Sequence, residues 1–89
     1  MAAMKNRVEP EICTFVDKES NSMTIEVILP GVIKDQIKLK VNSRCLILSA
    51  PAEKVEYEKY VHFYEPVKPE QTVASCDHEL LRIKIPLRA

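Results

Sequence analysis

The sequence predicts an all-β fold, an immunoglobulin-like antiparallel β-sandwich of about seven strands. Three observations lead to this prediction. Apolar residues recur at every second position in most segments, prolines and polar clusters interrupt the chain at short intervals, and no stretch has the three-to-four spacing of an amphipathic helix. A chain of 89 residues has room for one such domain with a single core.

The most regular alternation lies in residues 23–29, where four apolar side chains share one face and Thr24 and Glu26 share the other. A strand that is covered on one side has this pattern. Residues 37–41 and 80–86 repeat it, with lysine or arginine on the solvent face. Residues 45–50 are apolar on both faces, so we expect this strand to lie near the middle of a sheet.

Less regular segments complete the expected sandwich. Residues 55–64 are rich in tyrosine, valine and phenylalanine, which favour strands. Residues 72–76 form a further short strand, and residues 11–17 are expected to add one strand at an edge. We therefore divide the chain into a short amino-terminal extension over residues 1–10 and a sandwich domain over residues 11–87.

Pro30 and Gly31 separate the first two regular strands. Proline fixes φ and lacks an N–H group, whereas glycine reaches positive φ at little cost. Gly31 is the only glycine in the chain. We expect Pro30 and Gly31 to form a structural turn that ends one strand and starts the next.

Composition and charge argue against several function classes. With 13 basic and 13 acidic residues, the chain lacks the basic footprint of a nucleic-acid-binding protein. No apolar run approaches the roughly 20 residues of a membrane span, and the amino-terminal residues lack the apolar stretch of a signal peptide. The three cysteines are Cys13, Cys45 and Cys76. Their odd number and wide spacing favour free thiols in a reducing compartment over a disulfide framework. We expect a cytoplasmic protein that binds neither nucleic acid nor membrane.

No pattern in the sequence predicts catalysis. The serines and histidines lack the spacing of a nucleophile elbow or a triad; the candidates are Ser49, Ser75, His62 and His78. One glycine cannot build a phosphate-binding loop. Cys76 and His78 lie two residues apart, but two ligands do not make a metal site, and a thiol in a turn is the commoner case. We expect no catalytic residue, no metal site and no cofactor.

Residues 28–50, ILPGVIKDQIKLKVNSRCLILSA, resemble a segment of the alpha-crystallin domain of small heat-shock proteins. That segment begins with leucine, proline, glycine and valine and continues into two strands. Residues 74–86, ASCDHELLRIKIP, are similar to the family's closing signature, and residues 67–70 resemble its approach to that signature. The resemblance covers roughly residues 12–86, and the positions that match in the second half are Val67, Pro69, Glu70, Ala74, Leu81, Ile83 and Pro86.

The sequence departs from the family pattern at three places. Glu79 replaces the signature glycine, so we expect Asp77 and His78, which tolerate positive φ better than most residues, to build the turn. An arginine common in the family is not evident in residues 58–64. The chain between Ser49 and Tyr57 is too short for the strand that bacterial, archaeal and plant members exchange between subunits. A related CS-type co-chaperone domain, which has the sandwich without that loop, is therefore the alternative.

The resemblance implies an ATP-independent chaperone that holds partly unfolded proteins. In the family, a groove between two edge strands accepts an isoleucine-x-isoleucine segment of a neighbour's tail. By resemblance this groove is lined by Ile37, Leu39, Val41, Val73 and Ala74. The same residues can equally be ordinary core residues of the sandwich.

The resemblance also implies the partners. They are unfolded or partly folded proteins, a second copy in a weak dimer, and a larger chaperone. Two other functions stay open: a CS-type adaptor that docks on an ATP-driven heat-shock chaperone, and an interaction domain within a longer protein that is not a chaperone.

Further features have both a functional and a structural interpretation. Lys34, Lys38 and Lys40 could steer acidic partners, but alternating charge is usually a solvated face. Residues 85–87, IPL, imitate the family's tail motif, yet Ile85 is needed inside the last strand. The aromatic residues could form an exposed platform, although in strands they are more often core; they are Tyr57, Tyr60, Phe63 and Tyr64.

Overall fold

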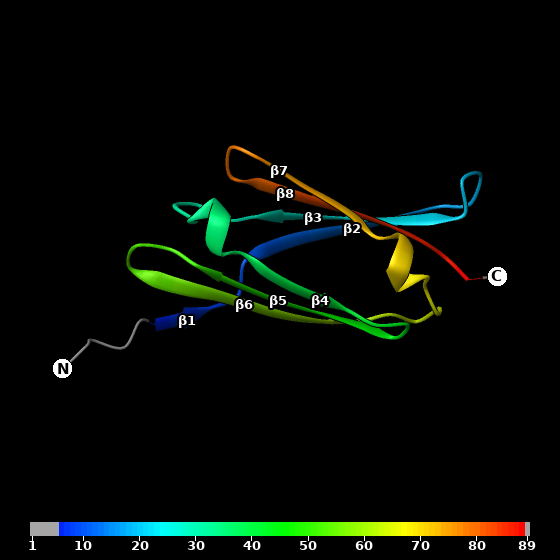
Figure 1. Cartoon of the computed structure of the whole chain (residues 1–89), viewed down its shortest axis with the longest axis horizontal. Helices are drawn as coiled ribbons and strands as arrows, with labels where there is room; N and C mark the ends of the chain where they lie inside the picture. The colour runs from blue at the N-terminus through cyan, green and yellow to red at the C-terminus, as the bar shows by residue number, and fades with distance from the viewer. Residues whose placement is uncertain (1–5, 89) are drawn as a thin grey trace.

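The computed structural model describes residues 6–88, which form two stacked β-sheets (Figure 1). This architecture confirms the predicted all-β sandwich. Within the described residues there is no helix long and apolar enough to cross a membrane. The elements in chain order are β1 (Asn6–Val8), β2 (Glu11–Asp17), β3 (Ser22–Ile28), the 3-10 helix η1 (Lys34–Gln36), β4 (Lys38–Val41), β5 (Cys45–Pro51), β6 (Val55–His62), the 3-10 helix η2 (Pro69–Gln71), β7 (Val73–Asp77) and β8 (Leu80–Pro86).

One sheet has the strand order β1-β6-β5-β4 and the other has the order β2-β3-β8-β7. All neighbouring strands run antiparallel except β1 and β6, which are parallel. The chain crosses between the sheets after β1, β3 and β6. As predicted, β5 lies inside its sheet between β4 and β6, and β2 forms an edge.

The core lies between the sheets and is made from alternate positions of the inner strands. Ile25 on β3 and Ile83 on β8 are register partners and are both fully buried. Leu46 and Leu48 of β5 face them from the other sheet. Burial of one such side chain contributes about 1.5–3 kcal/mol. The remaining buried apolar residues are Met23, Val27, Leu29, Ala50, Ala52, Tyr57, Phe63, Val67, Leu81, Ile85 and Leu87.

The amino-terminal end of the described chain belongs to a sheet. Residues 6–8 form β1 and pair with the first part of β6, from Val55 to Tyr57. The chain then leaves this sheet, and the buried Pro10 precedes β2 in the other one. Residues 1–5 of the predicted extension lie outside the described residues. Residues 6–8, which the sequence assigned to an extension outside the sandwich, therefore form a strand of one sheet.

The connection between β5 and β6 is a tight one. Residues 52–54 join the two strands, and Ala52 N–H donates to the Val55 carbonyl at 2.8 Å. The predicted short loop is confirmed, because β5 and β6 are consecutive strands of one hairpin. The predicted strand over residues 55–64 ends earlier, at His62, because Phe63 turns into the core and its N–H donates to the Arg44 carbonyl at 2.7 Å.

The end of the chain is fastened to the rest of the sandwich. Ile85 and Leu87 are both buried, and Leu87 forms an antiparallel bridge with Val67. Asn21 holds Leu87 twice: its carbonyl accepts from the Leu87 N–H at 2.8 Å, and its Nδ2 donates to the Leu87 carbonyl at 3.2 Å. The IPL triplet of residues 85–87 is therefore part of the core, as predicted for Ile85.

Candidate segment-binding groove

The turn after β3 positions the strand that borders the groove. Gly31 has φ 71°, in the left-handed region, and Val32 N–H donates to the Leu29 carbonyl at 3.2 Å. The nearest atom to a Cβ placed on Gly31 is the Ala52 Cβ at 4.0 Å, so space is available. Glycine is needed here for its backbone freedom and not for room. The predicted turn at Pro30 and Gly31 is confirmed.

Both sheets hold this turn in place. The hydroxyl of Tyr57, on β6, donates to the Pro30 carbonyl at 2.8 Å. From the other sheet, the carboxylate of Glu79 accepts from the Gly31 N–H at 2.7 Å, and the Glu79 carbonyl accepts from the Leu29 N–H at 2.8 Å. The turn is therefore anchored before β4 begins.

The strand β4 forms one wall of the groove. It pairs with β5, for example Leu39 with Leu48, and within residues 6–88 it has no strand on its other side. Ile37, Leu39 and Val41 are half-buried and pack against the core. Their row faces inward at an edge whose backbone groups can pair with another strand.

The strand β7 forms the opposite wall. It pairs only with β8 among the described residues. Ala74 lies opposite Ile83 and Cys76 lies opposite Leu81, so both point to the inner side. Cys76 is half-buried against the core, whereas Ala74 stays exposed although its row faces inward. Two small side chains therefore line this wall.

The predicted place of Val73 in the groove is wrong. Val73 is the register partner of Lys84, which is exposed on the outer face of the sheet, and 66% of Val73 is exposed. Adjacent residues of a strand point to opposite faces, so Val73 and Ala74 cannot line the same wall. Cys76, two residues after Ala74, takes that place. Strict alternation counted from Ala74 would have found it.

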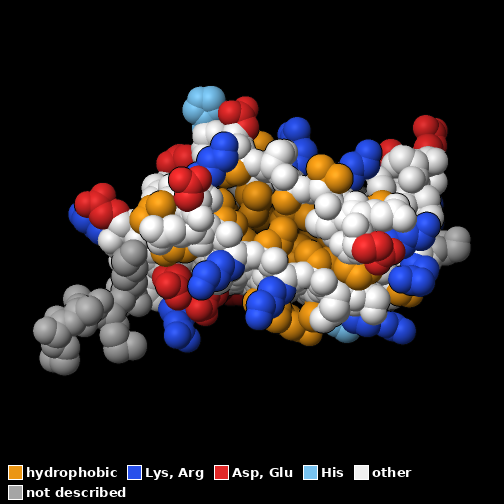
Figure 2. Space-filling view, in the orientation of Figure 1, with side chains coloured by type: hydrophobic (Ala, Val, Ile, Leu, Met, Phe, Trp, Pro, Cys, Tyr) orange, Lys and Arg blue, Asp and Glu red, His pale blue; other side chains and the backbone are white. Residues whose placement is uncertain are grey.

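The two walls meet across an apolar hollow. β1 and β2 are consecutive edge strands, so β4 and β7 are the edges on the other side of the sandwich. Figure 2 shows a band of hydrophobic side chains between the two sheets on this face. Of the predicted set, Ile37, Leu39 and Val41 pack against the core along one edge, and Ala74 lies on the inward side of the other edge with Cys76 two residues later. Such a site can accept an extended segment, whose main chain would pair with an edge.

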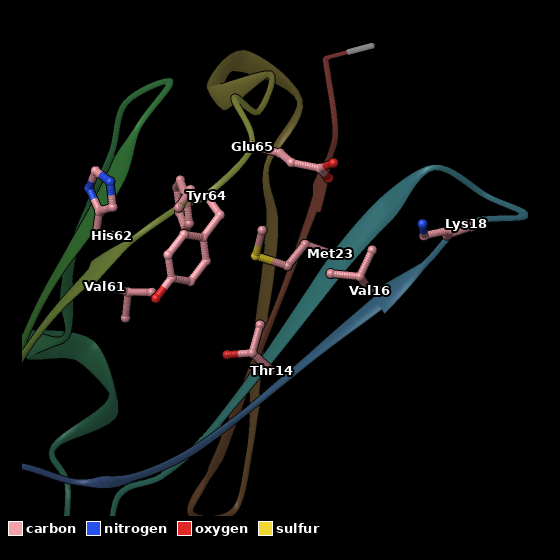
Figure 3. A pocket seen from close by; sticks show the side chains of 9 residues that line it. Thr14, Val16, Lys18, Met23, Val61, His62, Tyr64 and Glu65 are labelled. Carbon is pink, nitrogen blue, oxygen red and sulfur yellow. The ribbon is translucent and has the colours of Figure 1, made fainter.

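A second apolar cavity lies at the opposite edge, where sequence reasoning predicted nothing. β1 pairs with β6 only up to Tyr57, and two inward residues of β2, Thr14 and Val16, line a cavity together with Val61 of β6. Figure 3 shows these side chains with Met23 and Val61 around one space. The cavity measures about 530 Å³ and is lined by Thr14, Val16, Lys18, Met23, Val61, His62, Phe63, Tyr64 and Glu65.

The other sequence candidates do not come together as a site. Tyr57 and Phe63 are core residues, whereas Tyr60 and Tyr64 are exposed by 59% and 95%, so the four aromatics form no single platform. A hydrogen bond with the Cys45 side chain raises the pKa of Tyr60. All three cysteines are free thiols, as predicted.

No group of three or more metal-ligating side chains occurs within residues 6–88. The ring of His78 instead contacts Asp77 at 2.8 Å, and both side chains are exposed. His78 has φ 57°, which confirms that this residue builds the β7–β8 turn without the glycine.

The fold is shared with several solved structures. No protein-family model and no curated protein sequence matches this chain. Heat shock protein 16.0 from Schizosaccharomyces pombe superposes with a TM-score of 0.81 at 16% identity, over 92% of this chain and 68% of that one. A mutant of hsp14.1 from Sulfolobus solfataricus superposes with a TM-score of 0.77 at 22% identity, over 94% of this chain and 79% of that one.

A small heat-shock protein from Xylella fastidiosa superposes with a TM-score of 0.75 at 17% identity, over 90% of this chain and 86% of that one. Each of these likenesses covers at least 90% of this chain. Sequence identities of 16–22% show a shared fold and nothing more specific. The chain has the alpha-crystallin-domain fold of the small heat-shock proteins.

Proposed function

We propose that this chain is an ATP-independent chaperone of the small heat-shock type, which holds partly unfolded proteins. Its binding site is the groove between β4 and β7. The observation that supports this proposal is the pair of edge strands with an apolar inward row between them. A partly unfolded protein exposes extended apolar segments, and main-chain pairing to an edge captures such segments with little regard to sequence.

The chain's own IPL triplet is not available to fill this groove. Ile85 and Leu87 are buried, and Asn21 and Val67 hold the end of the chain against the sandwich. The IPL triplet is therefore not the proposed occupant. Of the residues given by the resemblance, the proposal keeps Ile37, Leu39, Val41 and Ala74, and it replaces Val73 with Cys76.

Suppression of aggregation tests this function. The purified chain is mixed, without nucleotide, with a heat-labile protein, and light scattering is followed during heating. Scattering should fall as the chain is added, and Leu39→Ser should reduce the protection. Ile47→Ser is the matched control, because Ile47 lies on the neighbouring strand but 46% of it is exposed on the outer face. Unchanged scattering at a several-fold excess of chain contradicts the proposal.

The CS-type adaptor is a second candidate, and the direct β5–β6 connection favours it. Residues 52–54 leave no place for an exchanged strand between β5 and β6. An adaptor would bind an ATP-driven heat-shock chaperone with an affinity that depends on nucleotide. Calorimetry with and without ATP measures this directly, and no binding in either state removes the adaptor function.

Weak self-association belongs to the proposal as well. Within the described chain, residues 58–62 of β6 have no partner on the side where β1 ends. An unpaired edge of this kind can pair with a second copy. Sedimentation velocity over a range of concentrations should show a dimer that dissociates on dilution.

A further inference from the structure

Two lysines on β4 stand beside the groove without an acidic partner. Lys38 and Lys40 are exposed on the outer face, where their register partners on β5 are Ser49 and Ile47. Among residues 6–88, neither lysine forms an ion pair. Two other cations do: the exposed Arg82 contacts Glu26 at 2.7 Å, and the half-buried Lys59 contacts Glu9 at 3.1 Å.

A strand added to the free edge of β4 would place its side chains in a fixed order. Residues opposite Leu39 would face the groove, and residues opposite Lys38 and Lys40 would lie on the outer face beside the two ammonium groups. Directly opposite side chains in a sheet have Cβ atoms about 5 Å apart, close enough for charge to matter. The alternation is the same whether the added strand runs parallel or antiparallel.

The inward positions of the added strand would meet the wall made by β7. Ala74 and Cys76 are both small, and Ala74 is exposed although it faces inward. Small side chains on this wall occupy little of the groove, which favours large aliphatic side chains on the added strand. A branched residue would fill it and remain in contact with Leu39 and the core.

We propose that the groove selects extended segments in which large aliphatic residues alternate with acidic residues. This inference rests on the proposed function, because it names the class of segment that the same groove holds. The aliphatic residues fill the space between β4 and β7. The acidic residues pair with Lys38 and Lys40, so the segment adds to the edge of β4. The edge of β7 is less favourable, because a segment there would bring an acidic residue beside Asp77.

Three labelled peptides test the selection. Their sequences are Val-Glu-Ile-Glu-Val, Val-Ser-Ile-Ser-Val and Val-Lys-Ile-Lys-Val, and binding to the whole chain is measured by fluorescence anisotropy. We expect the glutamate peptide to bind about fivefold more tightly than the serine peptide, because two opposite-charge pairs are gained. The lysine peptide should bind most weakly. Added salt should reduce these differences, since the charges are exposed.

A charge reversal locates the effect. The double variant Lys38→Glu and Lys40→Glu should prefer the lysine peptide over the glutamate peptide. The matched control is Lys54→Glu with Arg88→Glu, which changes the net charge equally at two exposed positions outside β4. The control should keep the original order. If the reversed variant keeps it too, the acidic residues do not pair with β4 and the inference is overturned.

The two levels of the proposal fail in different ways. If all three peptides bind equally well and Leu39→Ser weakens them all, the groove binds segments but does not select them by charge. If no peptide binds, or Leu39→Ser changes nothing, the groove is not the binding site and the proposed function fails with the inference. If Val16→Ser weakens binding and Leu39→Ser does not, the segment binds in the cavity at the opposite edge.

Discussion

The carboxylate of Glu79 accepts a hydrogen bond from the backbone N–H of Gly31 at 2.7 Å. A second bond, from the Leu29 N–H to the Glu79 carbonyl at 2.8 Å, joins the same two turns. One turn ends β7 and the other precedes β4. Glu79, which replaces the signature glycine of the family that the sequence resembles, therefore ties together the two turns beside the groove.

Removal of this carboxylate should lower stability modestly. Glu79→Ala loses the acceptor for the Gly31 N–H, at a cost of about 1 kcal/mol in the free energy of unfolding. Glu79→Gln should lose less, because its amide oxygen can still accept. Urea denaturation measures both, with Glu70→Ala as a control at another exposed glutamate. Equal losses in the Glu79→Ala and Glu70→Ala variants would show that the bond to Gly31 contributes nothing.

Gly31 should be sensitive to backbone strain and not to side-chain size. Gly31→Ala forces a side chain into φ 71°, which costs about 1–2 kcal/mol. Gly31→Asn is larger, but asparagine tolerates this region, so it should destabilise less than alanine. Thermal and urea unfolding of the two variants give the order. A greater loss for asparagine would indicate that space near Ala52 is the true restriction.

Leu87 should behave as a core residue in spite of its place near the end of the chain. It is buried, and its main chain is held by Asn21. Leu87→Ala should lower the free energy of unfolding by about 2–5 kcal/mol, the range for buried leucines. Ile28→Ala is the control, because Ile28 is 45% exposed. Similar small losses in both would mean that the last residues are not packed in solution.

Asp17 should add a small acid-sensitive contribution to stability. Its carboxylate accepts from the Ser20 hydroxyl and from the Glu19 N–H, both at 3.0 Å. These bonds, the Ser20 bond first, hold the pKa of Asp17 below its ordinary 3.8. A lowered folded-state pKa means that the contribution is complete above 3.8 and disappears as the pH falls through the folded-state value.

The variant Asp17→Ala isolates this contribution. Its urea midpoint should lie below that of the unaltered chain at pH 6, and the two midpoints should converge as the pH falls below 3.8 and through the lower folded-state pKa of Asp17, where the carboxyl is protonated in both states. A difference that stays constant across this range would mean that the charge of Asp17 has no part in it.

Much of the fold was predictable because it depends on local alternation. Residues 23–29 and 80–86 carry regular period-two patterns, and both became inner strands whose apolar rows are buried. The turn at Gly31 was equally clear, since one glycine after a proline has few other uses. These features are properties of single segments and need no knowledge of their partners.

The errors and omissions of the sequence analysis arise where pairing between distant segments determines the structure. The family resemblance placed both Val73 and Ala74 in the groove, but the register of β7 on β8 sets Val73 beside Lys84 on the outer face. The three residues of β1 are too few to show a period, and their strand exists through pairing with β6. The cavity around Met23 and Val61 is lined by residues that are far apart in the sequence, an arrangement that no local pattern encodes.

Hydrogen exchange with a bound client tests the central claim most directly. Amide exchange is measured by mass spectrometry in the chain alone and with a partly unfolded protein held in excess. We predict slower exchange in residues 37–41 and 73–77, because a paired segment protects the free edges of the groove, with little change in residues 11–17. Protection confined to residues 11–17 and 58–65, around the opposite cavity, would contradict the assignment of the groove.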